Sequence, residues 1–383
     1  MALNNYKLGD LLMRNSEENK DLIYGISDVR GVRNTKGISN TKIDVSGRNL
    51  KTFLVVRPGG FIFNHRVHDK LGLGYNTSDE TYIFTNDYVS FYVKPEVKNR
   101  ILLPDYLYMW YLRPEFDRYM LFKTYGSATL FFSWDNMCEL EIELPDLPTQ
   151  QKYVDAYNAM VANQQAYERG LEDLKLTCDG YIEDLRRKIP CEKIGKYIEL
   201  TELTNENSQY GIDDVMGISI EKKLIRTKAD MKDVNLAPYL LIQPNEFAYV
   251  TVTSRNGGKI SIALNDSDKT YICSSSYVVF RSRNIEELLP QYLMLFFSRN
   301  EFNRYSRFHS WGSAREAFDW DAMCDVQIPI PDIEIQKSIA EMYTVYNKRK
   351  KINEQLKAQI KNICPILIRG SLEYGGEPNG EPA

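Results

Sequence analysis

The chain repeats itself at an offset of 186 residues. Residues 103–150 match residues 289–336 without a gap, at 22 of 48 positions. Chance alone gives only a few identities over this length, so the two segments arose by duplication. The chain is therefore built from two related halves, and one half predicts the fold of the other.

The repeat continues toward the N-terminal side, with one slip in register. Tyr24-Gly25-Ile26 pairs with Tyr210-Gly211-Ile212 at the same offset, whereas Lys70 pairs with Lys259, three residues further on. The slip falls in a loop around residues 64–69 in the first half and 250–258 in the second. A shared frame with different loops suits one scaffold that carries two specificities.

Each half has the same order of expected elements. Short runs rich in β-branched and aromatic residues come first, and they predict strands. A helical stretch follows from Pro104 to Phe122, with Pro104 at its start, and a last strand ends at Pro145. We interpret Gly72-Leu73-Gly74-Tyr75 as a β-turn and not as a cofactor loop. The fold class is α+β, with strands at 53–56, 61–63, 82–84, 88–93 and 139–144.

A long helix is expected to close each half. The first covers residues 149–188, and its apolar residues alternate four and three apart, which is the period of a coiled coil. The second covers about 335–369; its seam is less regular, and Pro365 should kink its last turn. The two seams most simply pack on each other as an antiparallel coiled coil, although each helix could instead lie on its own domain. The predicted seam comprises Tyr153, Tyr157, Met160, Gln164, Tyr167, Leu171, Leu174, Cys178, Tyr181, Leu185, Ile339, Tyr343, Tyr346, Ile352, Leu356, Ile360, Ile363 and Leu367.

One local pattern occurs twice and carries a family resemblance. A segment from Gly126 to Trp134 precedes Pro145-Asp146 and Gln150, and the same pattern recurs from Gly312 to Trp320, at Pro331-Asp332 and at Gln336. With a globular head and a long helix in each half, the chain resembles the specificity (S) subunits of type I restriction-modification systems. The resemblance covers residues up to about Tyr374.

This resemblance implies a non-catalytic subunit. Each head would read one half of a bipartite, asymmetric site in double-stranded DNA. The helices would act as a spacer and dock two methyltransferase (M) subunits, which restriction (R) subunits join. S-adenosylmethionine, ATP and Mg are then expected on the partner subunits and not on this chain. The expected domains are a target recognition domain at 1–146, a spacer helix at 147–190, a second recognition domain at 191–332, a second spacer helix at 333–374 and a flexible tail at 375–383.

The residues themselves offer no obvious enzyme centre. No Asn/Asp-Pro-Pro-aromatic motif and no Gly-rich Lys-Ser/Thr loop occurs, which argues against a base methyltransferase and an ATP site. His65-x-x-His68 lacks a matching Cys/His cluster, so a metal site is not expected. No signal peptide and no membrane-length apolar run is visible, so we expect a cytoplasmic protein.

Two sets of polar loop residues are candidates for DNA contact. Arg and Lys can pair with guanine and Asn with adenine in the major groove, whereas small residues beside cations suit phosphates. The first set lies in the loops that differ between the halves, and the second flanks the repeated Gly-Ser-Ala. The first set is His65, Arg66, His68, Lys70, Thr253, Arg255, Asn256 and Lys259; the second is Lys123, Tyr125, Ser127, Arg307, His309, Ser313 and Arg315.

Other interpretations remain open at this point. The candidate loops could be ordinary solvated loops, and the Gly-Ser-Ala segment a packed turn. The basic stretch of Lys222, Lys223, Arg226 and Lys228 follows a DNA backbone or forms a solvated edge. The formal net charge of -4 gives no help to a DNA binder, although a basic surface can coexist with an acidic total. The rival functions are an assembly scaffold with degenerate heads and the specificity subunit of a related fused methylation system.

Overall fold

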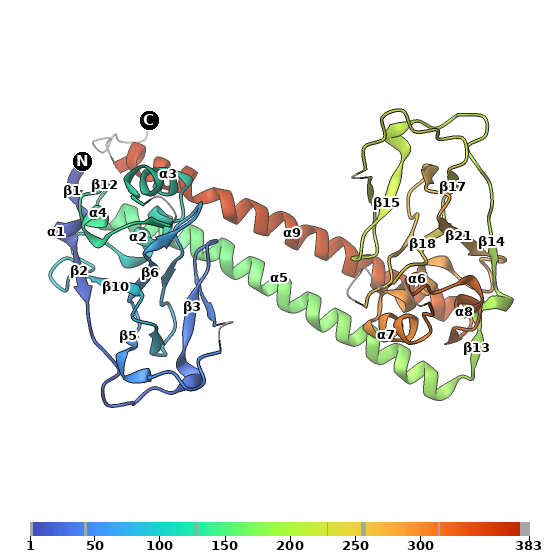
Figure 1. The fold of residues 1–383 in the computed structure, drawn as a ribbon, viewed down its shortest axis with the longest axis horizontal. Helices are drawn as coiled ribbons and strands as arrows, with labels where there is room; N and C mark the ends of the chain where they lie inside the picture. Colours follow the sequence, from blue (N-terminus) through green and yellow to red (C-terminus); the bar gives the residue numbers. More distant parts are fainter. Residues whose placement is uncertain are drawn as a thin grey trace, which may run out of the picture. The chain divides into compact units, whose positions relative to one another are not determined.

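The computed structural model describes residues 3–41, 44–126, 129–227, 229–253, 258–312 and 315–375. The chain forms two compact units (Figure 1). Unit 1 comprises residues 1–166 and 353–383, and unit 2 comprises residues 167–352. Each unit contains one β-rich head and parts of both long helices, and the units are described separately below.

The head of unit 1, called head 1, runs from the first strand to the strand before the first long helix. Short 3₁₀ helices at Ile26–Asp28 and Leu50–Thr52 interrupt its first strands. Its other elements are β1 (Asn4–Lys7), α1 (Leu8–Leu11), β2 (Leu12–Asn15), β3 (Arg30–Val32), β4 (Ile38–Asn40), β5 (Leu54–Val56), β6 (Phe61–Asn64), β7 (Arg66–Val67), β8 (Leu73–Tyr75), β9 (Tyr82–Phe84), β10 (Tyr88–Val93), α2 (Pro104–Tyr111), α3 (Pro114–Lys123), β11 (Leu130–Phe131), α4 (Trp134–Cys138) and β12 (Glu141–Leu144).

A four-stranded antiparallel sheet in the order β2-β10-β6-β8 forms the centre of head 1. Its buried face is aromatic. The rings of Phe61 and Phe91 stack at 5.0 Å, and Tyr111 of α2 meets both edge-on. Because aromatic side chains bury large areas, this cluster fixes α2 against the sheet.

The head of unit 2, called head 2, repeats this architecture with the sheet order β14-β21-β18-β19. Phe247 and Phe280 stack at 4.8 Å in place of Phe61 and Phe91. Short 3₁₀ helices lie at Ile194–Lys196 and Ile212–Asp214. The other elements are β13 (Cys191–Lys193), β14 (Ile198–Leu200), β15 (Met216–Ile218), β16 (Leu224–Arg226), β17 (Leu240–Ile242), β18 (Phe247–Val250), β19 (Ile262–Leu264), β20 (Tyr271–Cys273), β21 (Tyr277–Ser282), α6 (Pro290–Ser298), α7 (Asn300–Phe308), α8 (Trp320–Cys324) and β22 (Gln327–Pro329).

The α+β class predicted from the sequence is confirmed, but one predicted helix is wrong. The stretch from Pro104 to Phe122 forms two helices, because α2 ends at Tyr111 and α3 begins at Pro114. Proline lacks a backbone N–H and disfavours helix at the preceding residue, so Pro114 ends one helix and starts the next.

The β-turn predicted at residues 72–75 is also wrong. Leu73–Tyr75 forms the edge strand β8, which pairs with β6. Close packing, and not a turn, requires glycine at position 74, because a Cβ atom there would lie 2.6 Å from Cγ1 of Ile38. The glycine therefore lets β4 approach the sheet closely.

The two long helices pack together in both units. Helix α5 (Leu147–Lys188) and helix α9 (Ile333–Gly375) each contribute to both. In unit 1, Val154 from the start of α5 shares a core with Cys364 and Ile368 from the end of α9. In unit 2, Cys178 and Ile182 from the end of α5 share a core with Ile339 from the start of α9. The helices therefore run antiparallel within each unit, as predicted.

The predicted seam is wrong at one position on each helix, and α9 ends later than predicted. On α5 the buried residue is Ile182, whereas Tyr181 is exposed; on α9 Asn353 is buried, whereas Ile352 is exposed. Tyr181 and Ile182 are adjacent and both fit an apolar pattern, so the sequence could not choose between them. Asn353 is polar, and its buried partner Gln164 lies 189 residues away in the sequence. Helix α9 also continues past Pro365 to Gly375, so this proline does not lie in the last turn. None of the described helices is long and apolar enough to cross a membrane.

A buried polar pair interrupts the seam in unit 1. Gln164 Nε2 donates to Asn353 Oδ1 at 2.9 Å, and both side chains are buried. A buried polar pair weakens an apolar seam but favours the register that lets its members meet. Gln164, the one polar residue in the predicted α5 pattern, therefore specifies how α5 aligns with α9.

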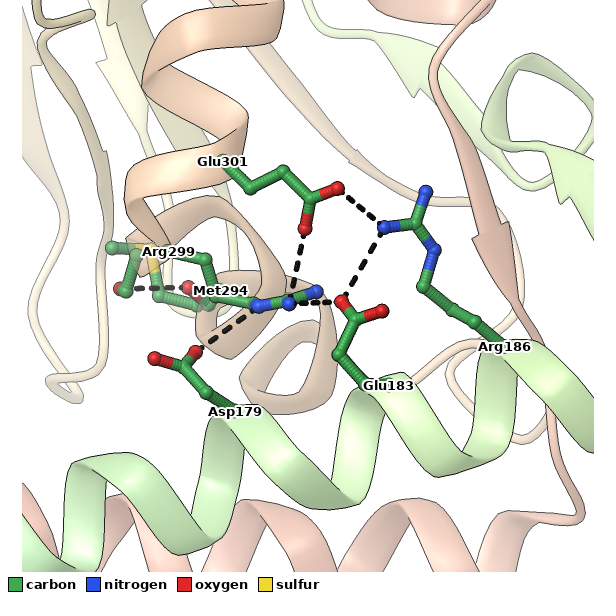
Figure 2. Close-up of polar contacts among 7 residues, drawn as sticks. Asp179, Glu183, Arg186, Met294, Arg299 and Glu301 are labelled. Carbon is green, nitrogen blue, oxygen red and sulfur yellow. Dashed lines mark hydrogen bonds and ion pairs between the residues drawn. The ribbon is translucent and has the colours of Figure 1, made fainter.

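An ion network joins α5 to head 2 (Figure 2). Arg299, between α6 and α7, donates from Nε to Asp179 at 3.1 Å and from Nη2 to Glu183. Glu301 accepts from the same guanidinium at 3.0 Å and from Arg186 at 2.6 Å. The side chain of Arg299 is 8% exposed, so the carboxylates of α5 help Glu301 to neutralise a buried cation.

Candidate nucleic-acid interface

The two candidate sets of head 1 come together in space. Strand β7, in the loop of the first set, pairs with β11, so that Arg66 lies opposite Phe131 and Val67 opposite Leu130. Phe131 also bridges to Tyr125 of the second set, with N–H···O bonds of 3.2 and 2.8 Å. We call residues 125–131 the glycine hairpin of head 1. The hairpin and the β7 loop form one continuous surface.

The β7 loop presents its basic side chains to solvent. Arg66, His68 and Lys70 are exposed, and no described residue forms an ion pair with any of them. His65 is half-buried: its ring stacks on Phe131 at 5.5 Å, and its Nδ1 lies 2.5 Å from the carbonyl oxygen of Asp87. His65 therefore supports the surface, while the other three side chains are free to meet a ligand.

The glycine hairpin of head 1 starts at the end of α3. Lys123 pairs with Glu139 at 3.1 Å, and the side chain of Tyr125 is exposed. Gly126 has φ +118°, and a Cβ atom there would lie 2.1 Å from the carbonyl oxygen of Thr129, so only glycine fits. Ser127, the remaining candidate of this hairpin, lies outside the described residues.

Head 2 builds the same surface. Ala317 bridges to both Trp311 and Val252, and Thr253 N donates to Glu316 O at 3.0 Å. Residues 311–317 are the glycine hairpin of head 2. Gly312 has φ +135°, and a Cβ atom there would clash with Arg315 O, so this position requires glycine too.

The loop candidates of head 2 have different environments. Thr253 is fully buried, and its hydroxyl donates to Ser310 Oγ at 2.9 Å, which holds the loop to the end of α7. This position leaves Thr253 no exposed surface for a ligand. Lys259 lies 3.9 Å from Glu221. Arg255 and Asn256 lie outside the described residues.

The hairpin candidates of head 2 are more accessible. Arg315 is exposed without an ion pair among the described residues, whereas Arg307 is exposed and paired with Glu316. His309 is half-buried, and its ring lies 4.2 Å from that of Tyr305. Ser313 lies outside the described residues. Among the described residues, the cations available at this surface are thus Arg315, the partly neutralised Arg307 and Lys259.

Two equivalent lysines hold a second hairpin in each head; the sequence analysis missed Lys36 and placed Lys222 in a basic stretch. Lys36 lies between β3 and β4, and its Nζ lies 2.6 Å from Asp117 of α3. The equivalent Lys222, between β15 and β16, donates to the Phe297 carbonyl at 2.5 Å. Burial lowers the pKa of both amines, that of Lys222 to about 7, with Lys259 adding to the shift. Lys222 therefore points into the head, and the interpretation of a basic stretch along DNA does not hold for it.

No metal cluster supports an alternative chemistry at this surface. Within the described ranges, no group of three His, Cys, Asp or Glu side chains is placed to hold a metal ion. The arrangement can offer cations, imidazoles and flat rings to a ligand, which suits an extended anionic partner with stacked bases.

Comparisons with known proteins agree with this geometry. The family model described as "Type I restriction modification DNA specificity domain" matches residues 200–362. That segment contains most of head 2 and much of α9, and the duplication extends the same pattern to head 1. Residues 200–362 are therefore similar to the DNA specificity domain of type I restriction-modification systems.

Individual relatives are distant. The specificity subunit of the type I restriction enzyme HindI from Haemophilus influenzae is 23% identical over 143 residues, which is 37% of this chain and 30% of that protein. The chain thus matches less than a third of the length of this relative. The type I S subunit from M. genitalium has a similar fold, with a TM-score of 0.56 and 9% identity over 99% of this chain and 97% of that chain. HsdS from Thermoanaerobacter tengcongensis aligns with a TM-score of 0.39 and 14% identity over 97% and 96% of the two chains.

Proposed function

We propose that this chain is a type I specificity (S) subunit that recognises DNA, with each head reading one half of a bipartite, asymmetric site. One observation carries the proposal: in each head, two loops far apart in the sequence form one surface of exposed cations and aromatic rings. The frame under that surface is the same in both heads, whereas the residues on it differ. A shared frame with different contacts is what two different half-sites require.

The exposed cations are the best candidates for base and phosphate contacts. Arg66 and Lys70 in head 1, and Arg315 in head 2, have guanidinium or ammonium groups that no described carboxylate neutralises. Arginine can donate two hydrogen bonds to guanine, and either side chain can bind phosphate. Thr253 and His65 would act on the loops, by fixing their shape.

The chain is proposed to work inside a larger, cytoplasmic complex. Domains 1–146 and 191–332 would be the recognition domains, 375–383 a flexible tail, and helices 147–190 and 333–374 the surface that docks two methyltransferase subunits, with restriction subunits joining for cleavage. The chain itself supplies no catalytic group; S-adenosylmethionine, ATP and Mg would bind the partners. A weak, salt-sensitive affinity of the isolated chain for DNA follows from the few free cations.

Exchange of heads tests the modular reading. Head 1, residues 1–146, is replaced by the corresponding segment of another S subunit, and the methylated sequences of cells that carry the chimera and its partners are determined. The first half-site should change while the second stays the same, and the converse exchange of 191–332 should do the opposite. Changes in both half-sites together would contradict the proposal. It would also be contradicted if the complex of the chain with its co-purified partners did not retain DNA selectively.

A single-residue test separates contact from general charge. Arg315→Ala should weaken binding to the cognate duplex by about 5- to 150-fold, the effect of one lost bidentate pair. Arg118→Ala is the matched control, because Arg118 is exposed on α3 but paired with Glu115. Equal losses in both variants would indicate non-specific electrostatics only.

A further inference from the structure

One aromatic side chain stands at the start of the glycine hairpin in each head. Tyr125 and Trp311 occupy equivalent positions, directly before Gly126 and Gly312, and the two residues are 59% and 70% exposed. Large aromatic residues normally bury most of their surface, and an exposed tryptophan is typical of a binding site. The duplication has kept an aromatic ring here, although the adjacent Thr124 is Ser310 in the second copy.

The hairpin holds each ring in place without covering it. The backbone of Trp311 makes two hydrogen bonds to Ala317, of 3.0 and 2.9 Å, and Gly312 after it adopts a positive φ that favours glycine. Ala317 lies opposite Trp311 in the hairpin, and its side chain is a methyl group, so it provides no ring on which the indole of Trp311 could stack. In head 1, Tyr125 lies at the end of a row of rings, 6.1 Å from Phe131, which in turn stacks on His65.

The charges around these rings favour a nucleic acid over an apolar protein surface. Arg315 and Arg307 lie in or beside the hairpin of head 2, and Arg66 lies opposite Phe131 in head 1. Cations beside an uncovered flat ring match a phosphate backbone with an accessible base face. An apolar protein pocket would instead be matched by branched aliphatic side chains without cations.

We propose that Trp311 and Tyr125 stack on the faces of DNA bases that each head separates from the base stack. This inference rests on the proposed function and deepens it, because it assigns a base-stacking subsite to each recognition surface. Bases in an intact duplex hide their faces, so a ring can reach one only where a step is opened or kinked. The hairpin would therefore read how easily a step opens, in addition to the hydrogen-bond pattern read by the cations.

A substitution series in the assembled complex tests the requirement for a flat ring. Trp311→Ala and Trp311→Leu should each weaken binding to the cognate duplex by about 5- to 100-fold, whereas Trp311→Phe should stay close to the unsubstituted protein. Ile285→Ala, which removes another exposed apolar side chain of head 2, is the matched control and should have no effect. Full binding by Trp311→Leu would overturn the proposal, because apolar docking does not need a ring.

A fluorescent base tests the opened step directly. 2-Aminopurine replaces adenine, one position at a time, in the half-site that head 2 reads. Its fluorescence should change at one position on binding of the unsubstituted complex and of Trp311→Phe, but not of Trp311→Leu. No change at any position, with selective binding intact, would overturn the stacking subsite and leave DNA recognition standing. If the unsubstituted complex did not bind the cognate DNA selectively, the proposed function itself would be refuted.

Acrylamide quenching distinguishes a protein partner from DNA. Trp311 is the most exposed of the four tryptophans, so the difference in quenching between the unsubstituted chain and Trp311→Phe reports on it. Protection should appear on addition of cognate DNA to the complex. Protection by partner subunits alone would show that Trp311 docks a protein, and it would overturn the proposal.

Discussion

Arg113 and Arg299 occupy equivalent positions in the two heads, but only Arg299 is held by carboxylates from a long helix. Arg299 meets Asp179 and Glu183 of α5 (Figure 2). Arg113 lies over the Trp110 ring at 4.3 Å and donates from Nε to the Trp110 carbonyl at 3.1 Å. No ion pair of Arg113 occurs among the described residues. At an offset of 186, α9 offers Pro365 and Arg369 where α5 offers Asp179 and Glu183.

This asymmetry predicts unequal effects of removing the two arginines. Arg299→Ala should lower the free energy of unfolding of unit 2 by about 3 kcal/mol, because Asp179, Glu183 and Glu301 would crowd together without their shared cation. Arg113→Ala should cost unit 1 only about 1 kcal/mol, the size of its cation–π contact. Hydrogen exchange of α7 and α3 measures the two units separately. Equal protection losses would contradict the role of the network.

The repeated glutamines predict a second matched pair of effects. Gln150 Oε1 accepts from Leu103 N at 2.9 Å, and its Nε2 donates to the carbonyls of Ile101 and Pro145. Gln336 makes the equivalent contacts with Leu289, Glu287 and Pro331. Both are fully buried, so each Gln→Ala change leaves three backbone groups unpaired and should cost about 2–4 kcal/mol.

Thermal unfolding and hydrogen exchange check this prediction. Gln150→Ala should loosen the start of α5 and α2 in unit 1, and Gln336→Ala should loosen the start of α9 and α6 in unit 2. Gln151→Ala is the control, because Gln151 is exposed and its amide bonds only to Asp155. A Gln150→Ala variant as stable as Gln151→Ala would refute the bridging role.

The sequence predicted what depends on local pattern. The strand at Tyr88–Val93 and the long helices follow from periodicity and are confirmed. The meeting of the β7 loop and the glycine hairpin could not be predicted, because it depends on pairing between residues about 60 positions apart. The burial of Thr253 and the inward turn of Lys222 were missed for the same reason: both are polar residues whose partners lie far away in the sequence. Gly126 and Gly312 carried a usable signal, since their positive φ and the lack of room for a Cβ atom both require glycine.

The buried lysines predict opposite responses to the same substitution. The pKa of Lys222 in the folded protein, about 7, lies below its usual value of 10.5, so the unfolded chain binds the proton more tightly. The charged amine therefore destabilises the fold fully below about pH 7, and this penalty fades as the pH rises from 7 toward 10.5. Lys222→Met should raise the unfolding midpoint relative to the unsubstituted chain at pH 6, and the gain should shrink by pH 9.

Lys36→Met is the matched comparison. Burial lowers the pKa of Lys36 as well, but Asp117 accepts from its ammonium at 2.6 Å. In head 2 the residue equivalent to Asp117 is Asn303, which carries no charge. Lys36→Met should therefore lower the midpoint at pH 7, because it leaves a buried carboxylate without its cation. Stabilisation by both substitutions would show that Asp117 contributes nothing.

The unpaired Arg113 leads to a prediction for a chain that ends near Pro190. Without α9, the start of α5 in one copy has no helix to pack against. The end of α5 in a second copy is the counterpart of the missing end of α9 and could take its place. In such a dimer Asp179 and Glu183 of each copy would reach Arg113 of the other, in the way that they reach Arg299 in the full chain. The truncated chain should therefore be dimeric by light scattering, and with its partners it should methylate a palindrome of the first half-site.

Charge variants make this prediction specific. Arg113→Ala should weaken the truncated dimer by about 10-fold or more, whereas in the full chain the same change should have the small effect given above. Arg118→Ala, in which the lost arginine is exposed and bonded only to Glu115, should leave the dimer intact. A truncated chain that stays monomeric, or a dimer indifferent to Arg113, would contradict the proposed self-complementarity. A dimer that depends on Arg113 would show that head 1 can still bind the carboxylates of a long helix, as head 2 does through Arg299. In the full chain, α9 has Pro365 and Arg369 at the positions of these carboxylates.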